Sequence, residues 1–370
     1  MNRCDFDLLQ LATPGVSSLK AYPPGKPLDE LKREYGISEA IKLASNENPL
    51  GPSPAVIDAV MTAMRDVARY PDGNSYYLKK ALADKHGVEL NQIIIGNGSN
   101  DILELVTRAV VTPEHEVLFS EHSFAVYPIV TQAVGAKAVV APAKNWGYDL
   151  DALAARISDK TRIIFIANPN NPTGTWLPKN QIKAFLDKVP SNVLVVLDEA
   201  YHEYVGEPEY GSALAWVSEY DNLLVARTFS KAYGMAGLRV GYSVSHPKVA
   251  DLLNRVRQPF NVNSLGQVAA VAALHDKDYL ARGVKLNNDG MAQLIAGFES
   301  LGLDYIPSVG NFICVDLAQT AAPINELLMR EGVIVRPIAN YGMPNHLRIS
   351  IGLQTENARF LTALKKVLNK

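Results

Sequence analysis

The sequence predicts an α/β protein with a large domain built on a mostly parallel sheet and a smaller C-terminal α/β domain. From about residue 46 to residue 258, short apolar runs alternate with helical patterns: QIIIGNG, EVLFSE, KAVVAP, RIIFIANP, NVLVVLDEA and NLLVART. Such Val- and Ile-rich runs are typical of parallel strands that helices cover on both faces. A long helical stretch follows, and then the strand patterns GNFICVDL, GVIVRP and HLRISIG and a last helix at ENARFLTALKKVL.

The expected division of the chain is an N-terminal arm over residues 1–45, a large domain over 46–258 and a small domain over 259–370. The arm region carries the Pro- and Gly-punctuated segments AYPPGKP and SNENPLGPSP around one short helical pattern, Leu28–Tyr35. It has little core of its own. The boundary between the two domains is expected near the Gln258–Asn263 loop.

Composition excludes several classes of function. The 370 residues are 48% hydrophobic, and 36 Lys and Arg stand against 38 Asp and Glu, so the net charge of -2 offers no basic field for nucleic acid or a membrane surface. The chain has no signal-peptide pattern and no apolar stretch of roughly 20 residues, which predicts a cytoplasmic protein. Cys4 and Cys314 are its two cysteines, and without a CxxC or Cys/His cluster they predict neither a disulfide nor a metal site.

Ligands of open parallel sheets bind at the carboxyl ends of the strands, so the loops after each run are the candidate site. After QIIIGNG, a helix is expected to begin at Ser99 and Asn100, and its unpaired N–H groups would form an anion site. The segment Gly96–Asp101 breaks the dinucleotide pattern GxGxxG at its last glycine, so it is weak evidence for a nicotinamide cofactor.

Two further strand ends carry polar side chains. The loop NPNNPTG follows RIIFIA, and its prolines hold Asn171 at the mouth of the sheet, although a plain tight loop explains the same pattern. Asp198 ends the buried run NVLVVLD, with Tyr201 three residues later. A buried carboxylate needs a cationic partner, so Asp198 is either part of a structural ion pair or the counter-ion of a bound cation.

The stretch TFSKAYGMAGLRVGY places Lys231 close behind an apolar strand and among small residues that leave room for a flat ligand. A lysine amine is the usual partner of an aldehyde, with which it forms a Schiff base. Thr228, Ser230 and Arg239 around it would hold a phosphate. An anion cradle, a carboxylate for a ring nitrogen, an amide and a phenol for a ring oxygen and a lysine for an aldehyde together describe a pocket for pyridoxal 5′-phosphate.

These residues also carry a resemblance. TFSKAYGMAG resembles the lysine signature of the class II aminotransferases, and NPNNPTG with DEAY is similar to fold type I pyridoxal-phosphate-dependent aminotransferases in general. More narrowly, KLASNENPLGPSP, RYPDG and GVIVRPIANYGMPNHLRISIG resemble the histidinol-phosphate aminotransferase family. The resemblance runs from Tyr22 to the C-terminus and implies the fold type I architecture, with a large cofactor-binding domain and a small C-terminal domain.

The resemblance implies a role for each candidate residue. Lys231, Asp198 and Tyr201 would be catalytic: the lysine binds the cofactor aldehyde and moves a proton, and the aspartate keeps the ring nitrogen protonated. Asn171 and Tyr201 would bond the ring's phenolic oxygen, and Phe124 would stack on the ring where many relatives carry Tyr, with core packing as the alternative. The phosphate would be held by Ser99, Asn100, Thr228, Ser230 and Arg239, and by Tyr70 from the second subunit of a homodimer.

The resemblance also implies the substrates. Arg336 and Arg348 would bind the substrate anions, with a surface salt bridge as the alternative, while Tyr22 would cover the substrate phosphate and Asn46 would lie near the substrate. The expected reaction transfers an amino group between histidinol phosphate and 2-oxoglutarate in histidine biosynthesis. Relatives with the same skeleton prefer aromatic amino acids or decarboxylate threonine phosphate. A non-catalytic regulator would need an extra DNA-binding domain, for which the 45 residues of the arm are too few.

Overall fold

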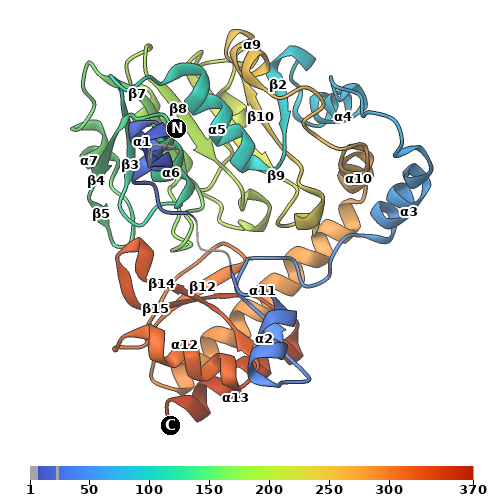
Figure 1. The fold of residues 1–370 in the computed structure, drawn as a ribbon, viewed down its shortest axis with the longest axis vertical. Coiled ribbons are helices and arrows are strands. Elements are labelled where there is room, and N and C mark those ends of the chain that lie inside the picture. Colours follow the sequence, from blue (N-terminus) through green and yellow to red (C-terminus); the bar gives the residue numbers. More distant parts are fainter. Residues whose placement is uncertain (1–6, 22–24, 370) are drawn as a thin grey trace, which may run out of the picture.

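The computed structural model describes residues 7–21 and 25–369, which form two α/β domains (Figure 1). The large domain contains a seven-stranded sheet of order β2-β10-β9-β8-β7-β3-β4. β10 pairs antiparallel with both of its neighbours, and the remaining pairs are parallel. The predicted α/β fold with a mostly parallel sheet is therefore confirmed. Its strands are β2 (Ile93–Gly96), β3 (Glu116–Ser120), β4 (Lys137–Ala141), β7 (Thr161–Ala167), β8 (Leu194–Asp198), β9 (Leu223–Thr228) and β10 (Gly241–Ser245).

The central strands are buried on both faces, because helices pack on each side of the sheet (Figure 1). Eight of the eleven residues of β8 and β9 are Leu, Val or Ala, and every one of the eleven is buried. The helices of this domain are α3 (Pro54–Ala63), α4 (Tyr76–His86), α5 (Ser99–Val110), α6 (Val126–Ala133), α7 (Leu150–Ala154), α8 (Lys179–Leu186), α9 (Pro247–Val256) and α10 (Ser264–His275), with the hairpin strands β5 (Ala143–Lys144) and β6 (Gly147–Tyr148) at the edge.

The small domain packs helices on a four-stranded sheet of order β11-β12-β15-β14. Its own hydrophobic core contains Phe298, Ile313, Leu347 and Phe360, all fully buried. Its elements are β11 (Tyr305–Ile306), β12 (Phe312–Asp316), α12 (Ala321–Arg330), β13 (Val333–Ile334), β14 (Arg336–Ile338), β15 (Met343–Ser350) and α13 (Gln354–Val367). The long helix α11 (Lys277–Ser300) runs from the large domain into this core (Figure 1).

The two cores divide the chain differently from the predicted limits of 46–258 and 259–370. α10 packs against α3 and α4, and its residues Ala269, Ala270 and Leu274 belong to the large core. The buried residues of α11 join the small core only from Met291 onward. The change of core therefore falls within α11 rather than in the loop at residues 258–263.

The predicted arm of residues 1–45 is also divided. α1 (Pro14–Ser17) lies against α6 of the large domain (Figure 1). The helix α2 (Leu28–Tyr35) forms where it was predicted, and its fully buried Leu31 packs with Ile334 of the small domain. β1 (Ile41–Lys42) pairs with β13. Residues 28–45 are therefore anchored on the small domain by these contacts.

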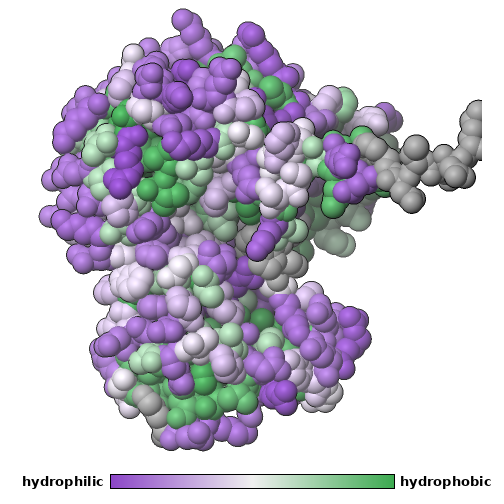
Figure 2. All heavy atoms as spheres, turned by 60° about the vertical axis from the view of Figure 1, so that its left-hand side comes forward, coloured by the Kyte–Doolittle hydropathy of each residue, from purple (hydrophilic) through white to green (hydrophobic). Residues whose placement is uncertain are grey.

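Figure 2 shows the two domains as separate masses that meet at a narrower waist. Most of the surface drawn there is hydrophilic, with smaller hydrophobic areas. Within residues 7–21 and 25–369, no helix is long and apolar enough to cross a membrane. The waist brings the carboxyl ends of the parallel strands close to β14 and β15, and the candidate site lies between them.

Candidate active site

A cavity of about 310 Å³ lies where the strand ends of the large domain face the small domain. Its volume falls at the lower end of the range of small-molecule sites, roughly 300–1,000 Å³. The structure brings most of the predicted site residues together around it: Asn46, Ser99, Asn100, Phe124, Asn171, Asp198, Tyr201, Thr228, Ser230, Lys231, Arg239, Arg336 and Arg348.

Two predicted site residues are not placed in this cavity. Tyr70 is 82% exposed and stacks on Phe260, with their ring centroids 4.8 Å apart. Its contribution to a site in a second subunit stays a prediction. Tyr22 lies outside the described residues, although Gly25 lines the cavity.

The N-terminus of α5 forms one end of the cavity. Gly98 is its N-cap with φ of 82°, and as a glycine it offers no side chain to satisfy the first N–H groups of the helix. Arg239 lies beside it, donating to the backbone oxygens of Asn97 at 3.2 Å and Ala236 at 3.0 Å and to the Ser230 hydroxyl at 3.3 Å. A free helix N-terminus and a guanidinium form an anion cradle.

Glycines make this cradle possible by close packing. A Cβ at Gly98 would lie 2.6 Å from Arg239 Nη2. A Cβ at Gly241 of β10 would lie 2.4 Å from the backbone nitrogen of Ser99. Side chains at these positions would therefore displace the arginine or the helix end. The hydroxyls of Thr228 and Ser230, which are both buried, complete the same wall of the cavity.

Asp198 lies at the carboxyl end of β8, between Ala167 of β7 and Ala226 of β9 in the sheet register. The side chain is buried, and burial raises the pKa of Asp198 to about 6. Its Oδ1 accepts from the backbone N–H of Ala200 at 3.2 Å, and its Oδ2 accepts from the hydroxyl of Tyr127 at 3.1 Å. A carboxylate placed in this way fits a cationic ring nitrogen, as predicted.

Tyr127 was missed by the sequence reasoning. It lies on α6, three residues after Phe124, and its ring meets the half-buried Phe124 ring at 89° with centroids 5.9 Å apart. Phe124 itself precedes the helix, since Ala125 is the N-cap of α6, and the backbone N–H of Tyr127 donates to the backbone oxygen of Phe124 at 3.0 Å. Nothing in the local sequence indicates that Tyr127 meets Asp198, because the two residues are 71 positions apart.

Lys231 follows β9 and reaches toward the cavity. Its Nζ donates to the backbone oxygen of Ser45 at 3.0 Å. Burial of the amine, with repulsion from Arg348 as the next cause, lowers the pKa of Lys231 to about 8. The small residues that follow Lys231 permit a tight turn: a Cβ at Gly234, where φ is 69°, would lie 2.0 Å from the backbone oxygen of Gly51. Because of its lowered pKa, a larger fraction of this amine is deprotonated at neutral pH than in an ordinary lysine. The deprotonated amine is the form that attacks an aldehyde.

Asn171 and Tyr201 form a hydrogen-bonded pair at the cavity wall. The Tyr201 hydroxyl accepts from Asn171 Nδ2 at 3.1 Å and from Asn46 Nδ2 at 2.9 Å. Burial raises the pKa of Tyr201 to about 12, so the hydroxyl keeps its proton and has it free to donate. Asn46 is in turn held by Ser350 Oγ, which accepts from its backbone nitrogen at 2.7 Å. The predicted amide and phenol donors thus meet in one place.

Arg336 and Arg348 come from the small domain and face the same cavity. They are directly paired across β14 and β15. Arg348 is buried, and it donates to Asn171 Oδ1 at 2.6 Å and to the backbone oxygen of Ala44 at 2.8 Å. Its Nε has no hydrogen-bond partner among the described residues. Two guanidinium groups at one wall suit an anionic substrate, because arginine binds carboxylate and phosphate bidentately.

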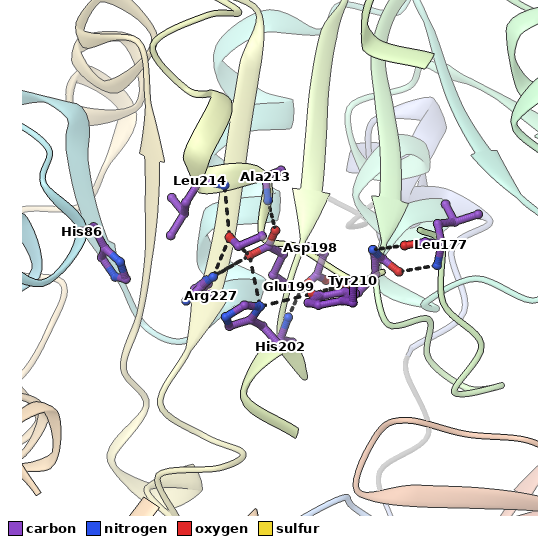
Figure 3. Close-up of polar contacts among 12 residues, drawn as sticks. His86, Leu177, Asp198, Glu199, His202, Tyr210, Ala213, Leu214 and Arg227 are labelled. Atoms are coloured by element: carbon purple, nitrogen blue, oxygen red, sulfur yellow. Dashed lines mark hydrogen bonds and ion pairs between the residues drawn. The ribbon is translucent and has the colours of Figure 1, made fainter. Parts of the chain in front are cut away.

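A buried ion pair between Arg227 and Glu199 lies beside Asp198 at the strand ends (Figure 3). Glu199 accepts from Arg227 Nε at 3.0 Å and Nη2 at 2.8 Å, from Ser212 Oγ at 2.7 Å and from the Ala213 nitrogen at 2.7 Å. Arg227 and Glu199 are 4% and 2% exposed. Sequence reasoning did not assign either residue, although an arginine inside the apolar run NLLVART was an available signal.

The residues of the cavity fit pyridoxal 5′-phosphate. The cradle at Gly98 would suit a phosphate, Asp198 a ring nitrogen, Asn171 and Tyr201 a phenolic oxygen, and Lys231 an aldehyde. In the described ranges, no group of three or more His, Cys, Asp and Glu side chains is arranged to hold a metal ion.

Comparison with known proteins identifies the family. The family model "Aminotransferase class I and II" matches residues 38–364. The chain is 62% identical over 364 residues to histidinol-phosphate aminotransferase 2 of Pseudomonas fluorescens, covering 98% of each protein. The corresponding figures for histidinol-phosphate aminotransferase 2 of Pseudomonas aeruginosa are 58%, with 98% of this chain and 99% of the relative covered.

A solved structure of a protein with the same name as these relatives is also similar to this chain. Histidinol-phosphate aminotransferase from Sinorhizobium meliloti in complex with pyridoxal-5′-phosphate superimposes with a TM-score of 0.87 and 31% identity, covering 96% of this chain and 97% of that one. The chain therefore belongs to the class I and II aminotransferases.

Proposed function

We propose that this protein is a pyridoxal-phosphate-dependent aminotransferase that moves an amino group between histidinol phosphate and 2-oxoglutarate. The observation that carries the proposal is one cavity that joins Lys231, Asp198 and the α5 cradle to Arg336 and Arg348. The relatives that share 62% and 58% of this sequence over nearly its full length carry the name of that activity.

When bound, pyridoxal 5′-phosphate supplies an aldehyde and an electron-withdrawing ring. The protein's part is to hold these groups. The N-terminus of α5, with Thr228, Ser230 and Arg239, holds the phosphate, and Phe124 covers one ring face. Asp198 accepts from the ring nitrogen and keeps it protonated. Asn171 and Tyr201 donate to the phenolic oxygen.

Lys231 moves the proton that the reaction requires. Its amine has a pKa of about 8. It accepts a proton from the substrate carbon and then donates that proton to the bound cofactor in the same cavity. A general base works best when its pKa lies near the working pH. Burial of the amine is the main cause of this match, because an exposed lysine would hold its proton up to about pH 10.4.

The two arginines determine which substrates fit. Arg336 and Arg348 lie on neighbouring strands, so their positive charges stand at one wall of the cavity. Histidinol phosphate presents a phosphate to this wall in one half-reaction, and glutamate presents its carboxylates in the other. The buried Arg348 contributes more than Arg336 to the selection of an anionic substrate, since a buried guanidinium binds an anion more strongly than an exposed one.

We also propose that the working unit is a homodimer. Ile57, Met61 and Met64 are spaced four and three residues apart, along α3 and the 3₁₀ turn Met64–Asp66, and are 49%, 66% and 49% exposed. Val67 and Tyr70 extend this apolar strip. A second copy would cover the strip and receive Tyr70 at its phosphate cradle. The cytoplasmic location stays a prediction.

The first test is a half-reaction followed by the visible absorption of the holoenzyme. Histidinol phosphate, phenylalanine and threonine phosphate are each mixed with the purified protein. We expect a rapid absorption change with histidinol phosphate at low concentration and slow changes with the others. A preference for phenylalanine would reassign the protein to aromatic transamination.

A matched pair of lysine variants tests the role of Lys231. Lys231→Ala should abolish turnover. Lys85→Ala is the control, because desolvation also lowers the pKa of Lys85, but this lysine is exposed, donates to the Tyr233 hydroxyl at 2.7 Å and does not line the cavity. Turnover that survives in Lys231→Ala would contradict the mechanism.

A further inference from the structure

Asp198 receives its hydrogen bonds from two neighbours. The backbone N–H of Ala200 donates to Oδ1 at 3.2 Å, and it is fixed by the course of the chain after β8. The hydroxyl of Tyr127 donates to Oδ2 at 3.1 Å. A substitution at Tyr127 can remove the second donor without moving the backbone, so one of the two contacts that orient this carboxylate depends on a side chain.

Tyr127 is itself fixed on every side. Its side chain is fully buried, and its ring stacks on Phe165 of β7 with centroids 4.6 Å apart and planes 3° apart. The Phe124 ring meets it at 89°. Phe124 lies just before Ala125, the N-cap of α6, and the backbone N–H of Tyr127 donates to the backbone oxygen of Phe124 at 3.0 Å, so this turn holds the two aromatic residues next to each other.

We infer that Tyr127 is a positioning residue for the cofactor ring, acting through its hydroxyl on Asp198 and through its ring on Phe124; this inference rests on the proposed function. Asp198 meets the ring nitrogen and Phe124 meets the ring face. One side chain therefore sets the relative position of the two groups that hold the pyridine ring. Tyr127 does not touch the reacting atoms and does not line the cavity.

The charges around Asp198 decide what the Tyr127 hydroxyl does there. Burial raises the pKa of Tyr127 well above its ordinary value, so the hydroxyl keeps its proton and donates throughout the accessible pH range. Donation favours the ionised carboxylate and opposes burial, which raises the pKa of Asp198 to about 6. The other titratable groups that face Asp198 are Glu199, which raises its pKa further, Lys231, which lowers it, and the hydroxyls of Tyr148 and Tyr201.

Loss of the Tyr127 hydroxyl raises the pKa of Asp198, so the carboxylate becomes protonated at a higher pH than in the wild type. A protonated Asp198 lacks the negative charge that stabilises a protonated ring nitrogen. Tyr127→Phe should therefore weaken cofactor binding on the acid side and leave it unchanged where Asp198 is ionised in both proteins.

The experiment measures the dissociation constant of pyridoxal 5′-phosphate from the full cofactor-free chain between pH 5.5 and pH 8.5. Tyr127→Phe keeps the ring and its stacking on Phe165, so it isolates the hydroxyl. We expect the ratio of its dissociation constant to that of the wild type to rise from near one at pH 8.5 to about tenfold at pH 5.5, the order expected for one hydrogen bond to a charged group. Ionisation of the ligand cancels in this ratio.

Tyr148→Phe is the matched control. It also removes a buried hydroxyl from the same core, but that hydroxyl accepts from the backbone N–H of Ala167 at 3.0 Å and does not bond Asp198. Its ratio should not change with pH. In an Asp198→Asn background, which has no carboxylate to protonate, Tyr127→Phe should likewise give a ratio independent of pH.

The outcomes separate the two proposals. A ratio for Tyr127→Phe that is flat with pH, like that of Tyr148→Phe, overturns the role of Tyr127 while leaving the proposed function intact. A ratio that still rises toward acid in the Asp198→Asn background also overturns it, because the hydroxyl would then act elsewhere. A wild-type chain that does not bind pyridoxal 5′-phosphate refutes the proposed function instead.

Discussion

Replacing Arg227 by Met should destabilise the protein by about 3–5 kcal/mol at pH 8, the cost of removing one partner of a buried ion pair. The substitution deletes two of the four hydrogen bonds to Glu199 and leaves those from Ser212 and Ala213. Those two donors are neutral, so a carboxylate that is 2% exposed would be left without a cation in contact. Glu199 is next to Asp198, so the penalty falls on the strand end that carries the site.

The assay is urea denaturation followed by circular dichroism, with Arg255→Met as the matched control. Arg255 also bonds one carboxylate oxygen through Nε and Nη2, at 2.9 Å and 2.6 Å from Asp251 Oδ2. That pair is a surface pair on α9, with side chains 69% and 55% exposed, and should contribute about 0.3–0.5 kcal/mol. Comparing the two substitutions isolates the effect of burial.

The pH dependence of the free energy of unfolding gives a second and stricter test of the Arg227–Glu199 ion pair. Burial, with the Arg227 charge as the next cause, lowers the pKa of His202 to about 4, and its Nδ1 lies 4.0 Å from Glu199 Oε2. Because the unfolded pKa is about 6.5, His202 makes the wild type lose stability as pH falls from about 6.5 to 4. Without Arg227, Glu199 raises the pKa of His202, and this loss shrinks.

Arg227→Met should therefore be less destabilising at pH 5 than at pH 8. The double variant Arg227→Met/Glu199→Gln should recover most of the lost stability, because no buried charge is left. A destabilisation below about 1 kcal/mol at pH 8, or one that grows toward acid, would refute this account of the ion pair.

Three further substitutions or conditions test the site itself. Gly98→Ala should weaken cofactor binding at least about tenfold by displacing Arg239, whereas Gly87→Ala, also at positive φ (67°) but with open space around it, should cost about 1 kcal/mol of stability and leave binding unchanged. The rate at which the cofactor-free chain captures an aldehyde should level off just above pH 8, and a rate that climbs beyond pH 10 would contradict the lowered pKa of Lys231. Asn46→Ala removes one of two donors to Tyr201 and should lower cofactor affinity about fivefold, measured by titration.

The sheet was predictable because most of its strands are short continuous apolar runs with clear breaks between them. The domain limits were not, and α10 shows why. Its apolar residues Ala269, Ala270 and Leu274 predict a buried helix face, but the same pattern would suit either core. Which core receives the face depends on α3 and α4, far earlier in the chain. Local periodicity carries no information about that choice.

The two-residue strand β1 illustrates the same limit at smaller scale. Ile41 and Lys42 pair with Val333 and Ile334, which lie 292 positions later in the chain. Each of these strands has only two residues and no periodicity of its own, so the pair forms because the fold brings the two segments together. The segment around β1 therefore looked like an arm in the sequence and is anchored on the small domain in the structure.

In the site, too, the positions of the main residues were predictable from the sequence, but the contacts that orient them were not. Asp198 ends one strand of the sheet, and Asn171 and Lys231 follow within four residues of the ends of two others, so the geometry of the sheet alone brings their side chains to one edge. The contacts that orient them are of another kind. Tyr127 reaches Asp198 across 71 positions, and Arg348 reaches Asn171 across 177.

These orienting contacts come from two sources with different consequences. Tyr127 belongs to the same rigid layer as Asp198, since its ring stacks on a strand of the same sheet. Arg348 and Ser350 belong to the small domain, and through Asn171 and Asn46 they reach both donors to the Tyr201 hydroxyl. The carboxylate end of the pocket is thus set by the large domain alone. The phenol and amide end is set jointly, so a change in how the two domains meet would be felt at Tyr201 and Asn171 before it reached Asp198.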